Sequence, residues 1–186
     1  MKLSLSLIFS FCLLAIASNT SAQNLSSQKG ITSLGAGVGL PYGGVIGLKL
    51  NHNLEDNFSA FGGIGYNLLG IGFNGGLTYT IPSFKSSELY FTGMYGYNAL
   101  IDIEGVPEYQ KVYYGASVGA GLKFNSLRFE GRYWDVGILV PLKNAAYRND
   151  IEEIENNPFI AIDSKPWPVQ FYFGYHIPLN SRSRNK

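Results

Sequence analysis

The sequence predicts an all-β fold, an antiparallel up-and-down barrel of eight strands, on the basis of three observations. The 186 residues include 13 Tyr, 12 Phe and 23 Gly, a composition that suits strands better than a helical bundle. Apolar residues alternate with small or polar residues in eight separate segments, which is typical of half-buried strands. Only 15% of the residues are charged, well below the roughly 25% of soluble domains.

Residues 1–22 are predicted to be a secretory signal peptide that is cleaved. Lys2 gives a positive start, residues 3–17 form an apolar run, and small residues precede the expected cleavage point. A membrane anchor helix is the alternative, but it would need a longer run of roughly 20 residues. Cleavage would remove Cys12, the only cysteine, so we expect no disulfide and no cysteine metal site.

Residues 31–180 are predicted to form the barrel, after a short N-terminal segment at 23–30. The clearest strand is 112–124, in which apolar or aromatic residues occupy every second position. Its length exceeds that of a usual strand and is sufficient to cross a membrane, which takes about 9 to 11 residues. The predicted strands are 33–40, 45–51, 58–67, 71–81, 89–99, 112–124, 127–134 and 169–179.

Each predicted strand has one large apolar face and one face of Gly, Ser, Thr, Asn and a few charged residues. A soluble lipocalin-like barrel, which stays open as an alternative, would enrich its outer polar face in Lys, Glu and Asp. Small polar faces instead fit the narrow interior of an eight-stranded barrel, and large apolar faces fit lipid. The sequence therefore predicts a transmembrane β-barrel, with aromatic residues near both rims: Phe58, Tyr79, Phe124 and Phe129 at one, and Tyr66, Tyr97 and Tyr133 at the other.

The two longest predicted connections, 102–111 and 141–166, lie at the same rim. Long loops are typical of the outer face of such barrels, so both termini are expected on the periplasmic side. Asn149 and Glu152 form a capping-box pattern that predicts a short helix; a solvated charged loop is the alternative. The acidic candidates for contact with a surface partner or a divalent cation are Asp102, Glu104, Glu108, Asp150, Glu152, Glu153 and Glu155.

Charged residues on the predicted inner face are expected to form an ion-pair network that fills the barrel. An anion-attracting pore is the alternative. Asp135 is expected at the outer rim instead, where charge is tolerated. The residues of the predicted network are Lys49, Lys123, Arg128, Glu130 and Arg132.

No catalytic, cofactor-binding or metal-binding residues are predicted. His52 and His176 are the only histidines; neither is followed by a serine two residues later, and both are expected at a rim. A catalytic triad needs Ser, His and an acid in contact. The formal net charge of +1 gives no footprint for nucleic acid.

The last predicted strand contains Tyr172, Gly174, Ile177 and Leu179, which resemble the sorting signal of outer-membrane barrels. With the signal peptide and the eight strands, the chain resembles small outer-membrane β-barrels of the OmpX type or the barrel part of OmpA-type proteins, followed by a basic tail at 181–186. The resemblance implies an outer-membrane location in a Gram-negative bacterium, contact with its lipid, and insertion by the barrel-assembly machinery.

The expected function is non-enzymatic, in envelope structure or in surface interaction through the long outer loops. A small pore or solute-binding barrel is one alternative, and a lipid-modifying enzyme is another. Fold alone does not decide between them.

Overall fold

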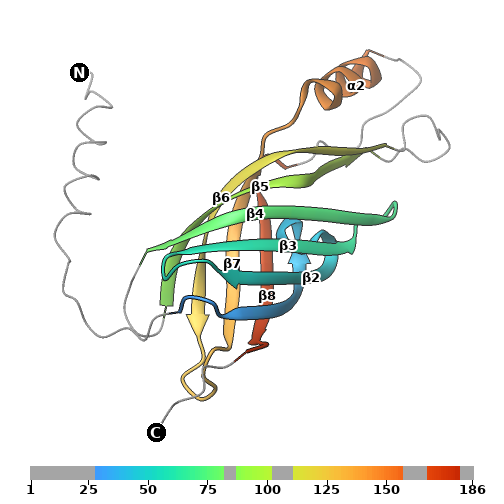
Figure 1. The fold of residues 1–186 in the computed structure, drawn as a ribbon. Coiled ribbons are helices and arrows are strands. Elements are labelled where there is room, and N and C mark those ends of the chain that lie inside the picture. The colour runs from blue at the N-terminus through green and yellow to red at the C-terminus, as the bar shows by residue number, and fades with distance from the viewer. Residues whose placement is uncertain (1–27, 82–86, 102–110, 157–166, 181–186) are drawn as a thin grey trace, which may run out of the picture.

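The computed structural model describes residues 28–81, 87–101, 111–156 and 167–180, which form one closed antiparallel barrel (Figure 1). Each strand pairs with the next, and β8 closes the barrel on β1. The predicted eight-stranded up-and-down fold is therefore confirmed. The strands are β1 (Thr32–Gly39), β2 (Gly44–Asn53), β3 (Phe58–Tyr66), β4 (Ile71–Ile81), β5 (Ser87–Ile101), β6 (Lys111–Asn125), β7 (Tyr133–Pro141) and β8 (Gln170–Pro178).

The two ends of the barrel differ, and we name them by what they contain. The terminal rim is the end where β1 begins and β8 finishes, because Ser33 pairs with Pro178. The distal rim is the opposite end, where β5 and β6 extend past their neighbours. The predicted signal peptide at 1–22 and the predicted tail at 181–186 lie outside the described residues.

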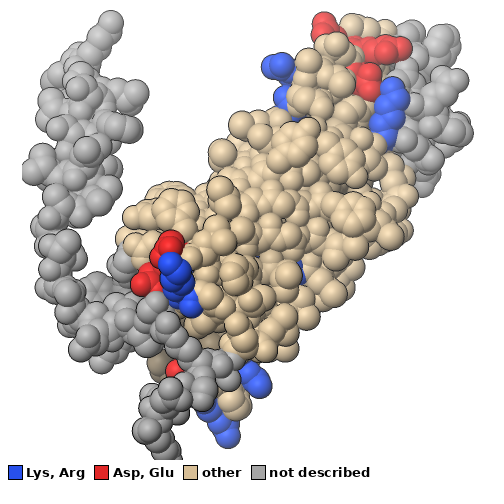
Figure 2. Space-filling view, viewed as in Figure 1, with Lys and Arg blue, Asp and Glu red and all other residues tan. Residues whose placement is uncertain are grey.

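Most polar side chains of the strands lie inside the barrel, and most large apolar side chains lie outside. Because side chains alternate across a strand, this follows directly from the period-two pattern. Leu48, Leu77, Phe91 and Ile138 are each about half exposed on the outer wall. Figure 2 shows an outer face almost free of charge, with Lys, Arg, Asp and Glu gathered toward the two ends. The buried polar residues of the strands are Ser33, Lys49, Asn51, Asn53, Ser59, Asn74, Thr78, Thr80, Glu88, Thr92, Asn98, Ser117, Lys123, Asp135 and His176.

Strand β7 differs from the prediction. Residues 126–132 form a turn, closed by a hydrogen bond from the Ser126 amide to the Arg132 carbonyl at 2.8 Å, rather than the start of a strand. The register then pairs Lys123 with Asp135. A one-residue shift exchanges the two faces of a strand, so Tyr133 turns inward and Trp134 turns outward, the reverse of the expectation.

The connection between β1 and β2 folds into the barrel instead of crossing its rim. Its 3-10 helix, η1 (Leu40–Tyr42), is buried throughout. Side chains at Gly47, Gly63 and Gly65 would overlap carbonyl oxygens of this segment. These glycines therefore allow a backbone segment to lie against the inner wall, and η1 plugs the distal half of the barrel.

A helix, α2 (Ala145–Glu155), follows β7 and packs against the extension of β5 and β6; it is drawn in orange in Figure 1. The Asn144 side chain caps it by accepting a hydrogen bond from the Tyr147 amide at 2.8 Å. The predicted helix is present, but it begins at this cap rather than at Asn149. Tyr147 and Ile154 pack against Tyr113 and its neighbours. No helix in the described part of the chain is long and apolar enough to cross a membrane.

Candidate functional site

Asp135 on β7 is the centre of a hydrogen-bonded cluster inside the barrel. Its Oδ2 atom accepts hydrogen bonds from Lys49 Nζ at 2.8 Å and from the Tyr42 hydroxyl at 3.2 Å. Its Oδ1 atom accepts a hydrogen bond from the Tyr90 hydroxyl. The side chains of Lys49 and Asp135 are only 6% and 2% exposed. A carboxylate so far from water needs this set of donors to stay buried.

Aromatic side chains extend this cluster across the interior. The hydroxyl oxygens of Tyr90 and Tyr172 lie 2.6 Å apart, and the Tyr42 hydroxyl lies 3.0 Å from His176 Nε2. The Tyr133 ring stacks on the His176 ring with centroids 4.5 Å apart. These rings come from η1, β5, β7 and β8. Their contacts therefore link strands that are not neighbours in the sheet, such as β5 and β8.

Glycines on the inner face make room for the rings. A Cβ atom at Gly174 would overlap the Tyr42 ring, and one at Gly137 would overlap the hydroxyl end of Tyr172. A Cβ atom at Gly35 would likewise overlap His176. The interior that the sequence predicts to be filled by short side chains is therefore filled by large rings facing glycines.

The structure places only two of the five predicted inner-face charges inside the barrel. Lys49 and Lys123 are buried. The placement of Arg128, Glu130 and Arg132 was wrong, because they belong to the turn before β7. Arg128 and Glu130 are exposed there, and Arg132 is half-buried.

Sequence reasoning missed Asp135 and His176, which were expected at the rims. Both are fully buried, and His176 Nε2 lies 3.5 Å from Asp135 Oδ2. The available signal was the alternation of Trp134, Val136, Ile138 and Val140, which places Asp135 on the opposite face. The register error in β7 concealed it.

The predicted sorting-signal residues divide between the two faces of β8 and its end. Tyr172 and Gly174 face the interior, where Tyr172 contacts Tyr90. Ile177 and Leu179 are exposed on the outer wall. The Leu179 amide donates to the Thr32 carbonyl at 2.8 Å, which closes the barrel at the terminal rim.

The predicted loop contacts are described only in part. Asp102, Glu104 and Glu108 lie outside the described residues, as does the side chain of Glu155. Glu152 and Glu153 are exposed on α2. The Asp150 carboxylate on α2 accepts hydrogen bonds from two residues of β6, Lys111 Nζ at 3.0 Å and the Tyr113 hydroxyl at 2.5 Å. No group of three potential metal ligands is present among the described residues.

The contacts of Asp150 predict a pH-dependent docking of α2. Hydrogen bonds from Tyr113 and Lys111 lower the pKa of Asp150 below its ordinary value of 3.8. A lowered folded pKa means that the stabilisation is complete above the ordinary value and is lost as the pH falls through the folded pKa. The protection of the α2 amides against hydrogen exchange, taken relative to the intrinsic exchange rate at each pH, should therefore fall on acidification below about pH 4. Asp150→Asn should remove most of this pH dependence, and an unchanged dependence in that variant would contradict the role of Asp150.

Ser33, His176 and Asp135 are in contact, although no sequence motif indicated it. The Ser33 hydroxyl lies 3.4 Å from His176 Nδ1 and 3.0 Å from the Tyr133 hydroxyl. A hydrolytic triad needs a nucleophile that a substrate can reach, whereas Ser33 is only 3% exposed and faces a cavity of only about 120 Å³. We expect no covalent labelling of the folded barrel by a fluorophosphonate probe. Labelling that disappears in Ser33→Ala would contradict this expectation.

Comparison with protein-family models, with curated proteins and with solved structures finds no match to this chain. The barrel's own geometry is therefore the basis for assigning a function.

Proposed function

We propose that this chain is an integral outer-membrane β-barrel whose interior is plugged, and that it acts without catalysis through the surface at its distal rim. In this proposal the apolar wall contacts lipid, the barrel-assembly machinery inserts the chain, and both termini are periplasmic. The helix α2 and the extension of β5 and β6 then stand on the outer surface.

The observation that supports the proposal best is the inverted distribution of polarity. The exposed side chains of the described strands are apolar, apart from tyrosine hydroxyls, except for His52 and Lys111 near strand ends. The interior meanwhile contains buried Lys49, Glu88, Lys123 and Asp135. Such a wall in water would exceed the apolar patches that monomeric soluble proteins expose, whereas lipid favours it.

Strand length and aromatic placement agree with the proposal. Seven of the eight described strands have 9 to 15 residues, enough for a tilted strand to cross a bilayer, and β1 has 8. Near the terminal rim, Phe58 packs on Tyr79 and Trp134 packs on Phe173; Tyr66 is exposed near the distal rim. The predicted girdle positions of Tyr97 and Tyr133 were wrong, because both rings turn inward.

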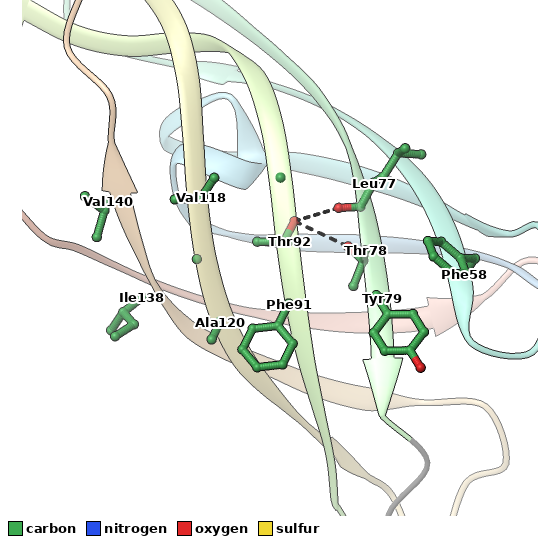
Figure 3. Close-up of a pocket in the computed structure, with 12 residues that line it drawn as sticks. Phe58, Leu77, Thr78, Tyr79, Phe91, Thr92, Val118, Ala120, Ile138 and Val140 are labelled. Carbon is green, nitrogen blue, oxygen red and sulfur yellow. Dashed lines mark hydrogen bonds between the residues drawn. The ribbon is translucent and has the colours of Figure 1, made fainter. Parts of the chain in front are cut away.

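A hollow of about 680 Å³ in the outer wall also suits lipid. Figure 3 shows Phe91, Leu77, Val118 and Ile138 around it, projecting from neighbouring strands. A Cβ atom at Gly93 would meet nothing within 4 Å, so the hollow is open at that point. In a bilayer an acyl chain would fill it.

The plugged interior favours a closed barrel over the alternative of a small pore. Tyr42, Tyr90, Tyr172 and His176 are each at most 2% exposed and pack within the barrel. We therefore expect no single-channel conductance when the purified barrel is reconstituted in a planar bilayer. Steps of reproducible conductance from the wild-type chain would favour the pore.

Cell fractionation tests the proposal as a whole. We expect the chain in the outer-membrane fraction, extracted only by detergent, with a gel mobility that differs between boiled and unboiled samples. A chain that stays in the soluble fraction without detergent would contradict the proposal. The apolar wall would then have to be covered by a protein partner.

A further inference from the structure

A second polar region lies at the terminal rim, next to the Asp135 cluster, with which it shares Ser33 and Tyr133. A cavity of about 120 Å³ opens there, between the beginning of β1, the end of β2 and the turn before β7. Its lining includes Lys123, Arg132, Ser33, Asn51, Tyr133 and Glu88. The cavity is smaller than the roughly 300 Å³ of typical organic-ligand pockets, so it admits only a small occupant.

The two buried lysines of the barrel are in different situations. Lys49 has its own carboxylate, Asp135, at 2.8 Å. Lys123 is also buried, but its Nζ donates one hydrogen bond, to Thr80 Oγ1 at 3.2 Å, and otherwise lies 5.6 Å from the centres of the Tyr90 and Tyr133 rings. No ion pair joins Lys123 to a carboxylate among the described residues. An ammonium group has three N–H donors, and burying it with no carboxylate in ion-pair contact is unfavourable.

Glu88 on β5 pairs with Lys123 on β6 in the strand register, but its carboxylate accepts hydrogen bonds from other residues. Its Oε1 atom accepts hydrogen bonds from Asn125 Nδ2 at 3.0 Å and from Gln28 Nε2 at 3.4 Å. The cavity is therefore lined by two cationic residues, Lys123 and Arg132, and by a single carboxylate that already has partners. Hydroxyl and amide groups, together with Ile31 and Gly131, complete the lining.

We propose that this cavity binds a small free oxyanion, either inorganic phosphate or a carboxylate of similar size, with Lys123 as its buried counter-ion and Arg132 as its partner at the mouth. Ammonium and guanidinium groups are the usual ligands of such anions. The volume excludes a lipid or a nucleotide. The proposal depends on the barrel interior alone, so it can fail or succeed independently of where the barrel resides.

Titration calorimetry of the folded barrel in octyl glucoside micelles tests the proposal, with inorganic phosphate and acetate as separate probes at constant ionic strength. We expect saturable binding of at least one probe. Lys123→Met should weaken it at least about tenfold, because a charge-assisted contact is lost. Arg132→Gln should weaken it too, and this variant changes a half-buried turn residue, so its fold should be retained. Lys111→Met, which removes an exposed lysine at the other rim, should bind like wild type.

Two results would overturn the assignment. The first is the absence of saturable binding of either probe to the folded wild-type barrel, which would mean that water alone fills the cavity. The second is binding that Arg132→Gln and Lys123→Met leave unchanged. If Lys123→Met does not fold, the comparison between Arg132→Gln and Lys111→Met decides the question.

Discussion

Asp135→Ala is expected to destabilise the barrel by about 3–5 kcal/mol, the usual loss when one partner of a buried ion pair is removed. The alanine would leave the buried Lys49 ammonium without its carboxylate. It would also remove the acceptor of the Tyr42 and Tyr90 hydroxyls. Urea unfolding of the barrel in lipid vesicles, followed by the gel mobility of unboiled samples, measures the loss.

A matched ion pair on the surface provides the control. Lys111 and Asp150 form a similar pair at 3.0 Å, but the Lys111 side chain is 47% exposed. Breaking it by Lys111→Met should change the free energy of unfolding by no more than about 1 kcal/mol. The double variant Lys49→Met with Asp135→Leu should recover much of the loss, because it leaves no unpaired buried charge. Equal effects at the two pairs would contradict the central position of Asp135.

Leu77→Arg is expected to destabilise the barrel in lipid by about 2–4 kcal/mol, the range for a lipid-facing arginine near the bilayer midplane. Leu77 lies in the middle of β4 and is 54% exposed on the outer wall. An exposed leucine in water could be replaced by arginine within about 0.5 kcal/mol. The size of the effect in vesicles therefore reports the medium around the wall.

Leu54→Arg is the control for this substitution. Leu54 is 46% exposed, similar to Leu77, but it follows β2 at the terminal rim. Its replacement should change the free energy of unfolding by about 0–1 kcal/mol, as expected near the membrane interface. Losses that are equal and small at both sites would contradict a lipid-facing wall.

The period-two pattern predicted most of the barrel because side-chain alternation and strand pairing are local properties. The clearest case is β6, whose apolar positions from Val112 to Phe124 match the predicted strand. The prediction failed at β7, because the predicted strands 112–124 and 127–134 leave only Asn125 and Ser126 between them. The true turn is longer and contains Gly131 at a φ of 77°, and its length decides which face Asp135 occupies.

The interior cluster could not be predicted in the same way. Lys49, Asp135 and His176 come from three strands, and their contact depends on the register of every pair between them. The inward fold of η1 also escaped prediction, since a four-residue connection between strands normally crosses a rim. The signal that remained was the glycine content of the inner face, which indicates close approach of another group but not which group it is.

Tryptophan fluorescence tests the membrane assignment most directly. The chain has two tryptophans, and Trp134 lies on the outer wall, stacked on Phe173. Trp167→Phe would leave it as the single probe. In reconstituted vesicles, lipids brominated on their acyl chains should quench Trp134 strongly, and aqueous iodide should quench it weakly. Strong quenching by iodide with none by brominated lipid would contradict a wall that faces lipid.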